Sequence, residues 1–424
     1  MLKKQYLLRG SFGYKVSTLI TGIGLSQIIP ILFSPVLTRL YAPEDFGSLA
    51  FFMASSSIGA IVSTGRYELA IMHPKDDNEA VNLLAVIIFL SLLTSIIIFI
   101  LLFLLGTHLL VFLNYPLTFT TVLLIPLGIF TSGCFQGLNY WLNRNCEFSS
   151  ISKYRIFQVT SIVVFSLILA FIKEIDEGLI FSFLFGMFFS VLPLINIIRQ
   201  NKKLISVGRA IAVSKKYSNY PKLLMPTGLF DTIAMQAPIF FMTKFFSKLI
   251  IGAYSLAFRM ISAPISVISG AFGQVFYNQI VSEVKKGENI SFVVFKTAKQ
   301  LTFISLALFV PMFFFGQEIF IIVFGTDWVD AGKYVEIISF AMMIRFIVSP
   351  LSTTFLATNN LKLGAFWQAL YMSTTLILFF YCSDFKIEKL LFAYTIHEIF
   401  LYLIYLFLII LVSKKFDKKN ICVA

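Results

Sequence analysis

Residues 81–105 read VNLLAVIIFLSLLTSIIIFILLFLL and contain no charged side chain. One helical span of a bilayer core requires about 20 apolar residues. The same character extends through all 424 residues, of which 58% are hydrophobic and 13% charged, with a mean hydropathy of +0.88. A soluble protein of this size is roughly a quarter charged. The composition therefore excludes a soluble globular enzyme and a disordered chain, and it predicts an all-α integral membrane protein.

Twelve apolar segments, separated by polar or turn-forming residues, are the predicted transmembrane helices. They lie at residues 16–38, 46–65, 81–105, 117–138, 156–172, 178–198, 223–243, 250–272, 300–323, 334–357, 363–382 and 390–412. We expect an N-terminal lobe at 1–198, a basic cytoplasmic linker at 199–222, and a C-terminal lobe at 223–424 that ends in a basic tail. Six spans per lobe predict a pseudo-twofold axis along the membrane normal.

The chain carries 34 Lys and Arg against 21 Asp and Glu, for a formal net charge of +13. With both termini in the cytoplasm, most of these basic residues fall in cytoplasmic loops, which is the usual bias of multi-pass membrane proteins. We therefore attribute the positive charge to topology and expect no nucleic-acid partner. The four cysteines and three histidines lack the spacing of a disulfide framework or a metal site. We expect neither a metal nor a cofactor.

Two stretches of the sequence correspond at a separation of 205 residues. Arg39 precedes Gly47 at the end of the first apolar segment, and Lys244 precedes Gly252 at the end of the seventh. Matching positions in two halves of the same orientation indicate the parallel kind of internal repeat that transporters use. A chance match within an apolar sequence is the alternative.

Polar residues at membrane depth are the candidate functional residues, because their burial in lipid is costly. The candidates for a substrate-binding cavity are Arg259, Arg345, Arg39, Arg66, Glu68, Asp231, Lys244, Gln27 and Gln236. Arg39 and Lys244 are equally suited to extending towards lipid headgroups. Candidates for ion coupling are Asp231, Glu398 and His397. Candidate hinges are Pro30, Pro35, Pro226, Pro238 and Pro264, since broken helices at matching places in two halves indicate a transport pathway.

Signatures of catalysis are missing from the sequence. It contains no GxxxxGK[ST] phosphate loop and no HExxH zinc motif. No loop of the predicted topology is long enough for a large external catalytic domain. We therefore expect a protein that is not an enzyme.

Three blocks of sequence carry a resemblance to a known family. Residues 37–47, 66–71 and 252–259 read LTRLYAPEDFG, RYELAI and GAYSLAFR. They resemble the bacterial polysaccharide flippases of the O-antigen translocase (Wzx) type, which belong to the multidrug/oligosaccharidyl-lipid/polysaccharide (MOP) exporter superfamily. The last four apolar segments match this family only in pattern.

The resemblance implies two lobes in a V around a central cationic cavity. By alternating access, such a protein moves an undecaprenyl-diphosphate-linked oligosaccharide, for O-antigen, capsule or exopolysaccharide, to the outer leaflet of the bacterial inner membrane. Membrane lipids are further partners, and a polysaccharide polymerase and a chain-length regulator are candidate protein partners. Arginine suits bidentate contacts with a diphosphate. Arg259, Arg345, Arg39 and Arg66 are thus expected to contact the headgroup, with Glu68 and Asp231 as switching partners.

Three alternatives remain at this point. An ion-coupled exporter of small amphiphilic molecules from the same superfamily would require an acidic, aromatic cavity, for which Asp231 and Glu398 are the deep carboxylates. A membrane-embedded polysaccharide-modifying enzyme would require a catalytic His, and His73 and His108 lack a convincing partner. A scaffold for a glycan synthesis complex is the third.

Overall fold

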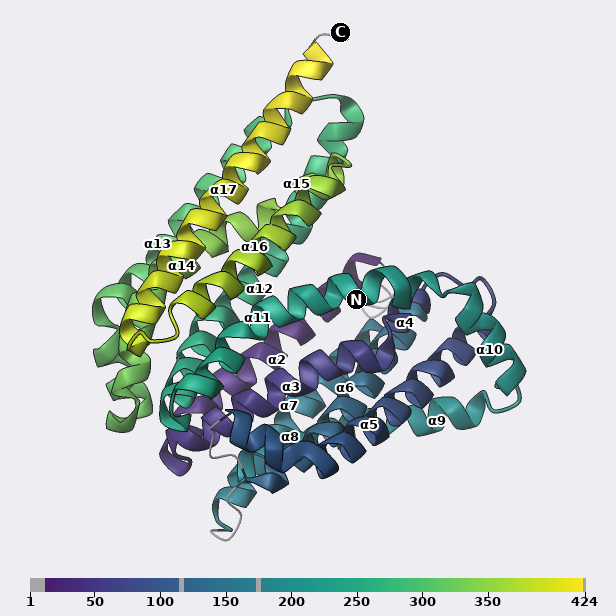
Figure 1. Cartoon of the computed structure of the whole chain (residues 1–424). Helices are drawn as coiled ribbons and strands as arrows, with labels where there is room; N and C mark the ends of the chain where they lie inside the picture. The colour runs from purple at the N-terminus through teal and green to yellow at the C-terminus, as the bar shows by residue number, and fades with distance from the viewer. Residues whose placement is uncertain (1–11, 114–117, 173–176, 422–424) are drawn as a thin grey trace, which may run out of the picture. The chain divides into compact units, whose positions relative to one another are not determined.

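The computed structural model describes residues 12–113, 118–172 and 177–421, and these residues form helices and short connections without a β-strand (Figure 1). The predicted all-helical class is therefore confirmed. The chain divides into two compact units, Met1–Gly252 and Ala253–Ala424.

The first unit contains ten α-helices and one π-helix among its described residues, with the start of α12 at its end. They are α2 (Phe12–Leu40), α3 (Pro43–Thr64), α4 (Tyr67–Ala70), α5 (Asp77–Leu113), α6 (Phe119–Arg144), α7 (Phe148–Ala170), α8 (Gly178–Val191), α9 (Pro193–Gln200), α10 (Val207–Lys216), the π-helix η1 (Tyr220–Leu224) and α11 (Met225–Phe245).

The second unit is built from long helices that begin with α12. They are α12 (Lys248–Lys286), α13 (Ile290–Phe324), the 3-10 helix η2 (Thr326–Trp328), α14 (Val329–Leu351), α15 (Thr354–Ala357), α16 (Leu361–Tyr381) and α17 (Ile387–Ile421).

The ends of α3 show how local sequence fixes one of these helices. Pro43 occupies the first turn, where its missing N–H costs nothing, and the Asp45 carboxylate accepts the Ala42 N–H at 3.0 Å. Gly65 ends the helix in the left-handed conformation, at a φ of 56°. Arg66 follows, also left-handed, at a φ of 60°, so the chain turns sharply and places Arg66 beside the end of α3.

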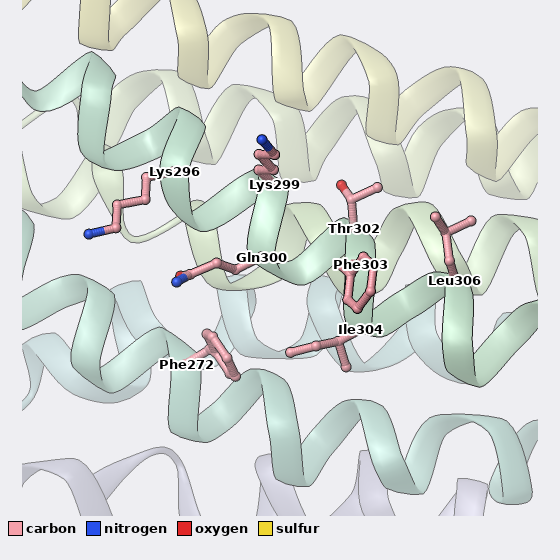
Figure 2. Close-up of a pocket in the computed structure, with 8 residues that line it drawn as sticks. All are labelled: Phe272, Lys296, Lys299, Gln300, Thr302, Phe303, Ile304 and Leu306. Carbon is pink, nitrogen blue, oxygen red and sulfur yellow. The ribbon is translucent and has the colours of Figure 1, made fainter.

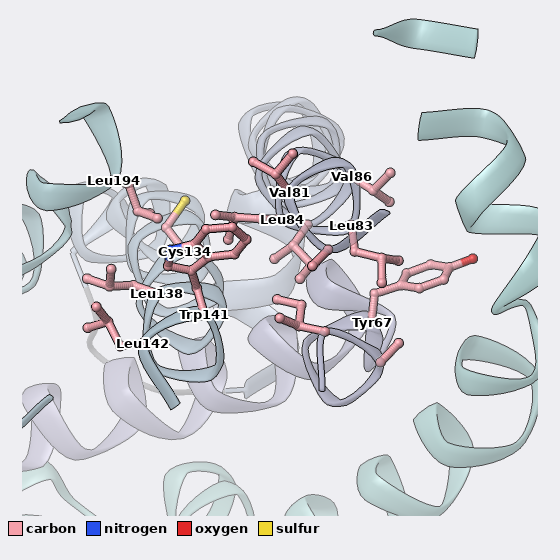
Figure 3. Packing of buried hydrophobic residues seen from close by; sticks show 14 of the residues in the cluster. Tyr67, Val81, Leu83, Leu84, Val86, Cys134, Leu138, Trp141, Leu142 and Leu194 are labelled. Carbon is pink, nitrogen blue, oxygen red and sulfur yellow. The ribbon is translucent and has the colours of Figure 1, made fainter. Parts of the chain in front are cut away.

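A buried cluster near the start of α5 holds the first unit together (Figure 3). Tyr67 from α4, Leu83 and Leu84 from α5, and Leu138 and Trp141 from α6 belong to it. The turn between α4 and α5 is fixed in addition by a cation. The Arg144 guanidinium donates to the carbonyl oxygens of Ile71 and Pro74 and forms an ion pair of 3.0 Å with Asp77.

The repeated glycines Gly47 and Gly252 lie against each other, where the start of α3 meets the start of α12. A Cβ on Gly252 would overlap the Pro43 carbonyl and lie 2.6 Å from its carbon, and one on Gly47 would overlap the Lys248 carbonyl. Small residues allow membrane helices to approach this closely. The two glycines found by the repeat therefore form one helix crossing.

In the second unit, α13 packs along α14, and α14 along α17. The first turn of α13 is capped from the far end of α17, because the Asp417 carboxylate accepts the N–H groups of Ile290 and Ser291 at 2.8 and 3.1 Å. The Asn289 side chain accepts the Phe292 N–H at 3.0 Å. The first three N–H groups of α13 are therefore satisfied, as helix starts require.

Eleven helices of the described residues are long and apolar enough to cross a membrane. The seventh predicted span, 223–243, is not among these eleven. It corresponds to α11, a helix of 21 residues that is less apolar because it carries Asp231, Gln236 and Lys244. The polar stretch between the predicted spans 250–272 and 300–323 is itself mostly helical, because α12 and α13 extend through it and the chain turns near Gly287, at a φ of 72°. Polar side chains keep a helix out of the lipid core, but they do not end the helix.

Candidate functional site

Arg66 and Glu68 form the centre of a polar cluster in the first unit. The Arg66 Nη1 lies 3.6 Å from the Glu68 Oε1, and the Glu68 side chain is only 1% exposed against 25% for Arg66. The unusual turn at Gly65 and Arg66 brings both side chains to the same end of α3. We name Arg66, Glu68, Asp231 and Tyr140 the Arg66 cluster.

Helix α11 supplies the next member of the Arg66 cluster. Gly228 presents a bare backbone to the Arg66 guanidinium, and a Cβ there would lie 2.5 Å from the Arg66 Nε. Asp231 follows Gly228 by three residues and therefore lies on the same face of α11. The Arg66 charge acts on the Asp231 carboxylate, so one guanidinium interacts electrostatically with two acidic side chains from different parts of the chain.

Tyr140 of α6 completes the cluster. Its phenol group lies within electrostatic range of Glu68, Arg66 and Arg155, the last of which comes from α7. Further along α11, the Gln236 Nε2 donates to the Ser57 hydroxyl at 3.3 Å, which joins α11 to α3. The cluster therefore presents a partly exposed cation whose charge acts on two carboxylates and on the Tyr140 phenol group.

The buried carboxyl group of Glu68 has a pH dependence that can be predicted. Glu68 lies between α3 and α5, outside the predicted spans, and burial raises its pKa above the ordinary range, with the Arg66 charge opposing this effect. A raised folded-state pKa means that the favourable contribution is present at low pH and is lost as pH rises through that pKa. Glu68→Gln removes this dependence, so the melting temperature of the variant relative to wild type should rise between pH 4 and pH 8.

The free energy of unfolding that Glu68→Gln gains over wild type between low and high pH is about 1.4 kcal/mol for each unit by which burial raises the Glu68 pKa. Thermal unfolding in detergent across this pH range measures it. Asp76→Asn is the control. Asp76 is fully exposed and accepts hydrogen bonds from Asn78 that lower its pKa, so the difference of this variant from wild type should fall, not rise, with pH. A Glu68→Gln difference that is flat or falls with pH would contradict the burial argument.

A second polar cluster lies in the second unit around Arg345 and Glu398. Glu398 of α17 is 0% exposed, and neither of its carboxylate oxygens has a hydrogen-bond partner among the described residues. The Arg345 charge, from α14, acts on this carboxylate, and the Arg345 Cζ lies 5.8 Å from the centre of the Tyr402 ring. We name Arg345, Glu398 and the aromatic residues around them the Arg345 cluster.

Aromatic rings enclose the Arg345–Glu398 pair. The rings of Trp367 and Tyr405 stack 3.9 Å apart at 11°, and Tyr402 lies edge-on to Trp367 at 5.4 Å. The hydroxyl groups of Tyr371 and Tyr394 act on the Glu398 carboxylate. The further members are Tyr254 and His397. The Arg345 guanidinium is stabilised by cation–π attraction to Tyr402, and its charge acts on Glu398 without a salt bridge between the two among the described residues.

The other residues named from the sequence lie outside both clusters. Arg39 and Lys244 are exposed at the last turns of α2 and α11, and Arg259 and Gln27 are half-buried in α12 and α2. Helix α2 continues through Pro30 and Pro35, and α11 through Pro238, with Pro226 in its first turn. Pro264 lies in α12, but its side chain is outside the described part of the chain. Cavity and hinge roles for these residues stay predictions.

Several members of the clusters were not named from the sequence as site residues. Tyr140 lies in α6 and Arg155 in α7, and only the fold brings Tyr140 to Arg66 and Glu68 and brings Arg155 to Tyr140. The aromatic residues of α17 carried a visible signal, since Tyr394, Glu398, Tyr402 and Tyr405 recur at helical spacing.

The surface of the second unit has a groove between α12 and α13 with a volume of about 700 Å³ (Figure 2). Phe272 and Gln300 face each other across it, and Phe303 adds an apolar wall. Lys296 and Lys299 stand at one end of the groove, but their ammonium groups point in different directions. The groove therefore has an apolar wall and two ammonium groups that do not point towards a common site.

Comparison with protein families identifies the chain. The profile of the family described as "Polysaccharide biosynthesis protein" matches residues 36–333, which is more than half of the sequence. The chain belongs to this family. The matched region contains the whole Arg66 cluster and the start of α14, and it ends before Arg345. No curated protein matches the chain at the sequence level.

Solved structures share the fold of this family member along almost its whole length. The lipid II flippase MurJ in an inward closed conformation is 15% identical with a TM-score of 0.73, covering 96% of this chain and 91% of that one. An inward-facing MATE-family transporter of the MOP superfamily is 13% identical with a TM-score of 0.63, covering 94% and 95%. The MATE multidrug transporter DinF-BH is 14% identical with a TM-score of 0.62, covering 95% and 94%. The resemblance seen in the sequence is therefore confirmed at the level of family and fold.

Proposed function

We propose that the protein is a flippase that moves undecaprenyl-diphosphate-linked oligosaccharide repeat units from the cytoplasmic to the outer leaflet of the bacterial inner membrane. The observation that carries this proposal is the Arg66 cluster, in which a partly exposed guanidinium acts electrostatically on the Glu68 and Asp231 carboxylates. Membership of the polysaccharide biosynthesis family supports a glycan substrate, and the fold shared with MurJ supports transport of a lipid-linked one. The translocated repeat units would serve the synthesis of O-antigen, capsule or exopolysaccharide.

The chemistry of such a substrate matches this arrangement. Each sugar hydroxyl group would cost several kcal/mol to strip of water in an apolar medium, so a hydrated route is needed. The diphosphate is an anion, and a guanidinium binds phosphate through two parallel hydrogen bonds. In this proposal Glu68 and Asp231 hold Arg66 when no substrate is present, and the diphosphate competes with them. Binding then loosens the contact between α4 and α11.

The remaining residues take supporting roles in the proposal. Arg259, Arg345, Arg39 and Lys244 add positive charge along the route, and Gln27 and Gln236 offer hydrogen bonds. The prolines of α2, α11 and α12 act as hinges for alternating access between lobes 1–198 and 223–424. Both termini are cytoplasmic, and the protein moves its substrate without a chemical reaction. A polymerase and a chain-length regulator receive the flipped product.

The test of this proposal is a translocation assay in proteoliposomes with undecaprenyl-diphosphate oligosaccharide. Wild type is expected to move the substrate, and Arg66→Ala to lower the rate at least about tenfold, because a hydrogen bond to a charged group contributes about 1.5–3 kcal/mol. Gly228→Ala should also lower the rate, since its new methyl group displaces the guanidinium without removing it.

Matched controls separate a local effect from a general one. Arg199→Ala removes an exposed arginine outside the Arg66 cluster, and Gly208→Ala adds a methyl group where no atom lies within 4 Å. Both should transport like wild type. If wild type moves no lipid-linked sugar, the proposed function fails. If Arg66→Ala folds and transports normally, the function stands and the assignment of Arg66 is wrong.

The Arg345 cluster favours a second candidate function, the ion-coupled export of small amphiphilic molecules. A buried carboxylate surrounded by aromatic rings is the arrangement that such an exporter requires, with Glu398, His397 and Asp231 as coupling candidates. Efflux of cationic dyes by wild type, lost in Glu398→Gln, would favour the exporter. Transport of lipid-linked sugar without dye efflux would exclude it.

A further inference from the structure

A groove of about 820 Å³ runs between α16 and α17 in the second unit. Lys362 lines it from the first turn of α16, and Lys415 lines it from the last part of α17. Asn359 and Asn360 lie at the same end and add amide groups. In contrast to the groove of Figure 2, the two cations here come from different helices and line one space.

The positive charge of this groove has no acidic partner within the part of the chain that the structure describes. Both lysines are exposed, and no salt bridge to either is present among the described residues. The nearest acidic residue along α17 is Asp417, and its carboxylate is occupied by the N–H groups at the start of α13. The end of the groove is therefore a site for an anion.

The walls of the groove become apolar within one or two helical turns of the lysines. Phe366 follows Lys362 by four residues and is 62% exposed, and Leu411 and Leu408 precede Lys415 by four and seven. These spacings place each apolar residue on the same helix face as its lysine. At 1.5 Å per residue, the apolar wall extends about 10 Å from the charged end.

An anionic headgroup with an acyl chain fits this order of charge and apolar surface. In the predicted topology, the connection before α16 and the end of α17 are both cytoplasmic, so the lysines lie at the level of the cytoplasmic headgroups. Basic pockets between membrane helices on this side bind anionic lipids. We propose that the groove between α16 and α17 is a binding site for an anionic glycerophospholipid, with its phosphate at Lys362 and Lys415 and an acyl chain along Phe366, Leu408 and Leu411.

The proposal is tested by native mass spectrometry of the purified full chain in micelles that contain equal amounts of phosphatidylglycerol and phosphatidylcholine with the same acyl chains. Wild type should retain phosphatidylglycerol in preference to phosphatidylcholine. Lys362→Ala/Lys415→Ala should lower this preference roughly 30-fold, since each basic residue near an anionic lipid contributes about a factor of five. Phe366→Ala should lower the retention of both lipids and leave their ratio unchanged.

Lys414→Ala/Lys418→Ala is the matched control, because these lysines are exposed on the same helix but do not line the groove. This variant should keep the preference of wild type. Equal loss in both double variants would mean that only general surface charge attracts the lipid, which overturns the proposal. A wild type that shows no preference between the two lipids overturns the proposal too. So does a dimer that Phe366→Ala dissociates, because the groove would then be occupied by a second copy of the chain. The readout does not involve transport, so it is independent of the proposed function.

Discussion

Arg345→Leu is expected to lower the free energy of unfolding by about 1–3 kcal/mol. The substitution leaves Glu398, which is 0% exposed, without the cation that acts on it. A buried carboxylate has lost its hydration, and neither Glu398 oxygen has a hydrogen-bond partner among the described residues to replace it. The melting temperature of the purified protein in detergent, followed by the fluorescence of a thiol-reactive dye or by circular dichroism, measures the loss.

Removing the charges of both Arg345 and Glu398 tests whether these two residues contribute to stability or to transport. Opposite charges taken out of water are often no more stabilising than apolar residues of similar volume. Arg345→Leu/Glu398→Leu is therefore expected to recover most or all of the stability that Arg345→Leu loses. If the recovered double variant also transports normally, the Arg345 cluster serves packing alone. If it is stable but inactive, the pair serves transport.

The control for this cycle is Lys333→Leu, which breaks an exposed salt bridge with Glu388 of 2.6 Å in the same unit. Exposed pairs contribute about 0–1 kcal/mol, so the change in melting temperature should be small. An Arg345→Leu variant that melts like the control would show that Glu398 is not held by Arg345.

Gly252→Ala is the second substitution with a large expected effect. Its methyl group would overlap the Pro43 carbonyl, a backbone atom fixed by the first turn of α3, so α3 and α12 must separate at their crossing. Forcing extra volume into a packed contact costs about 1–3 kcal/mol, and more where the backbone must move. We expect a lower melting temperature and less folded protein in the membrane.

Gly270→Ala is the control in the same helix, because a Cβ there has no atom within 4 Å. It should be neutral or slightly stabilising, since Ala is favoured over Gly in a helix by about 1 kcal/mol. Gly47→Ala should resemble Gly252→Ala, because its methyl group meets the Lys248 carbonyl across the same crossing. Normal stability of both variants would contradict the close packing of this helix pair.

The sequence was sufficient for the class of fold, because hydropathy measures which residues a bilayer accepts. It also identified Arg66, Glu68 and Asp231 one by one, as charged residues near apolar segments. Their proximity was not predictable, because Asp231 reaches Arg66 only when α11 packs on α3, and Gly228 provides the space for it. Hydropathy also did not indicate the helical extensions of α12 and α13, because these extensions are polar and lie beyond the apolar segments.

The internal repeat shows the same limit, because it relates positions in the sequence without showing which of them are in contact. The spacing between Gly47 and Gly252 suggested that the two halves correspond, but not that the two glycines touch. The Arg345 cluster required the tertiary structure as well, since Trp367 and Tyr371 come from α16 and Arg345 from α14. Periodicity places residues on one helix face and does not say which helix faces it.

The cap that Asp417 provides at the start of α13 has a practical consequence for mapping the topology of the protein. Reporter domains are commonly fused to successively shorter chains to determine which side of the membrane each loop occupies. A fusion that ends before residue 417 removes the acceptor for the Ile290 and Ser291 N–H groups, and so disturbs a helix more than a hundred residues upstream. Reporters inserted after residue 421, or into loops of the intact chain, preserve this link and report the orientation of the native protein.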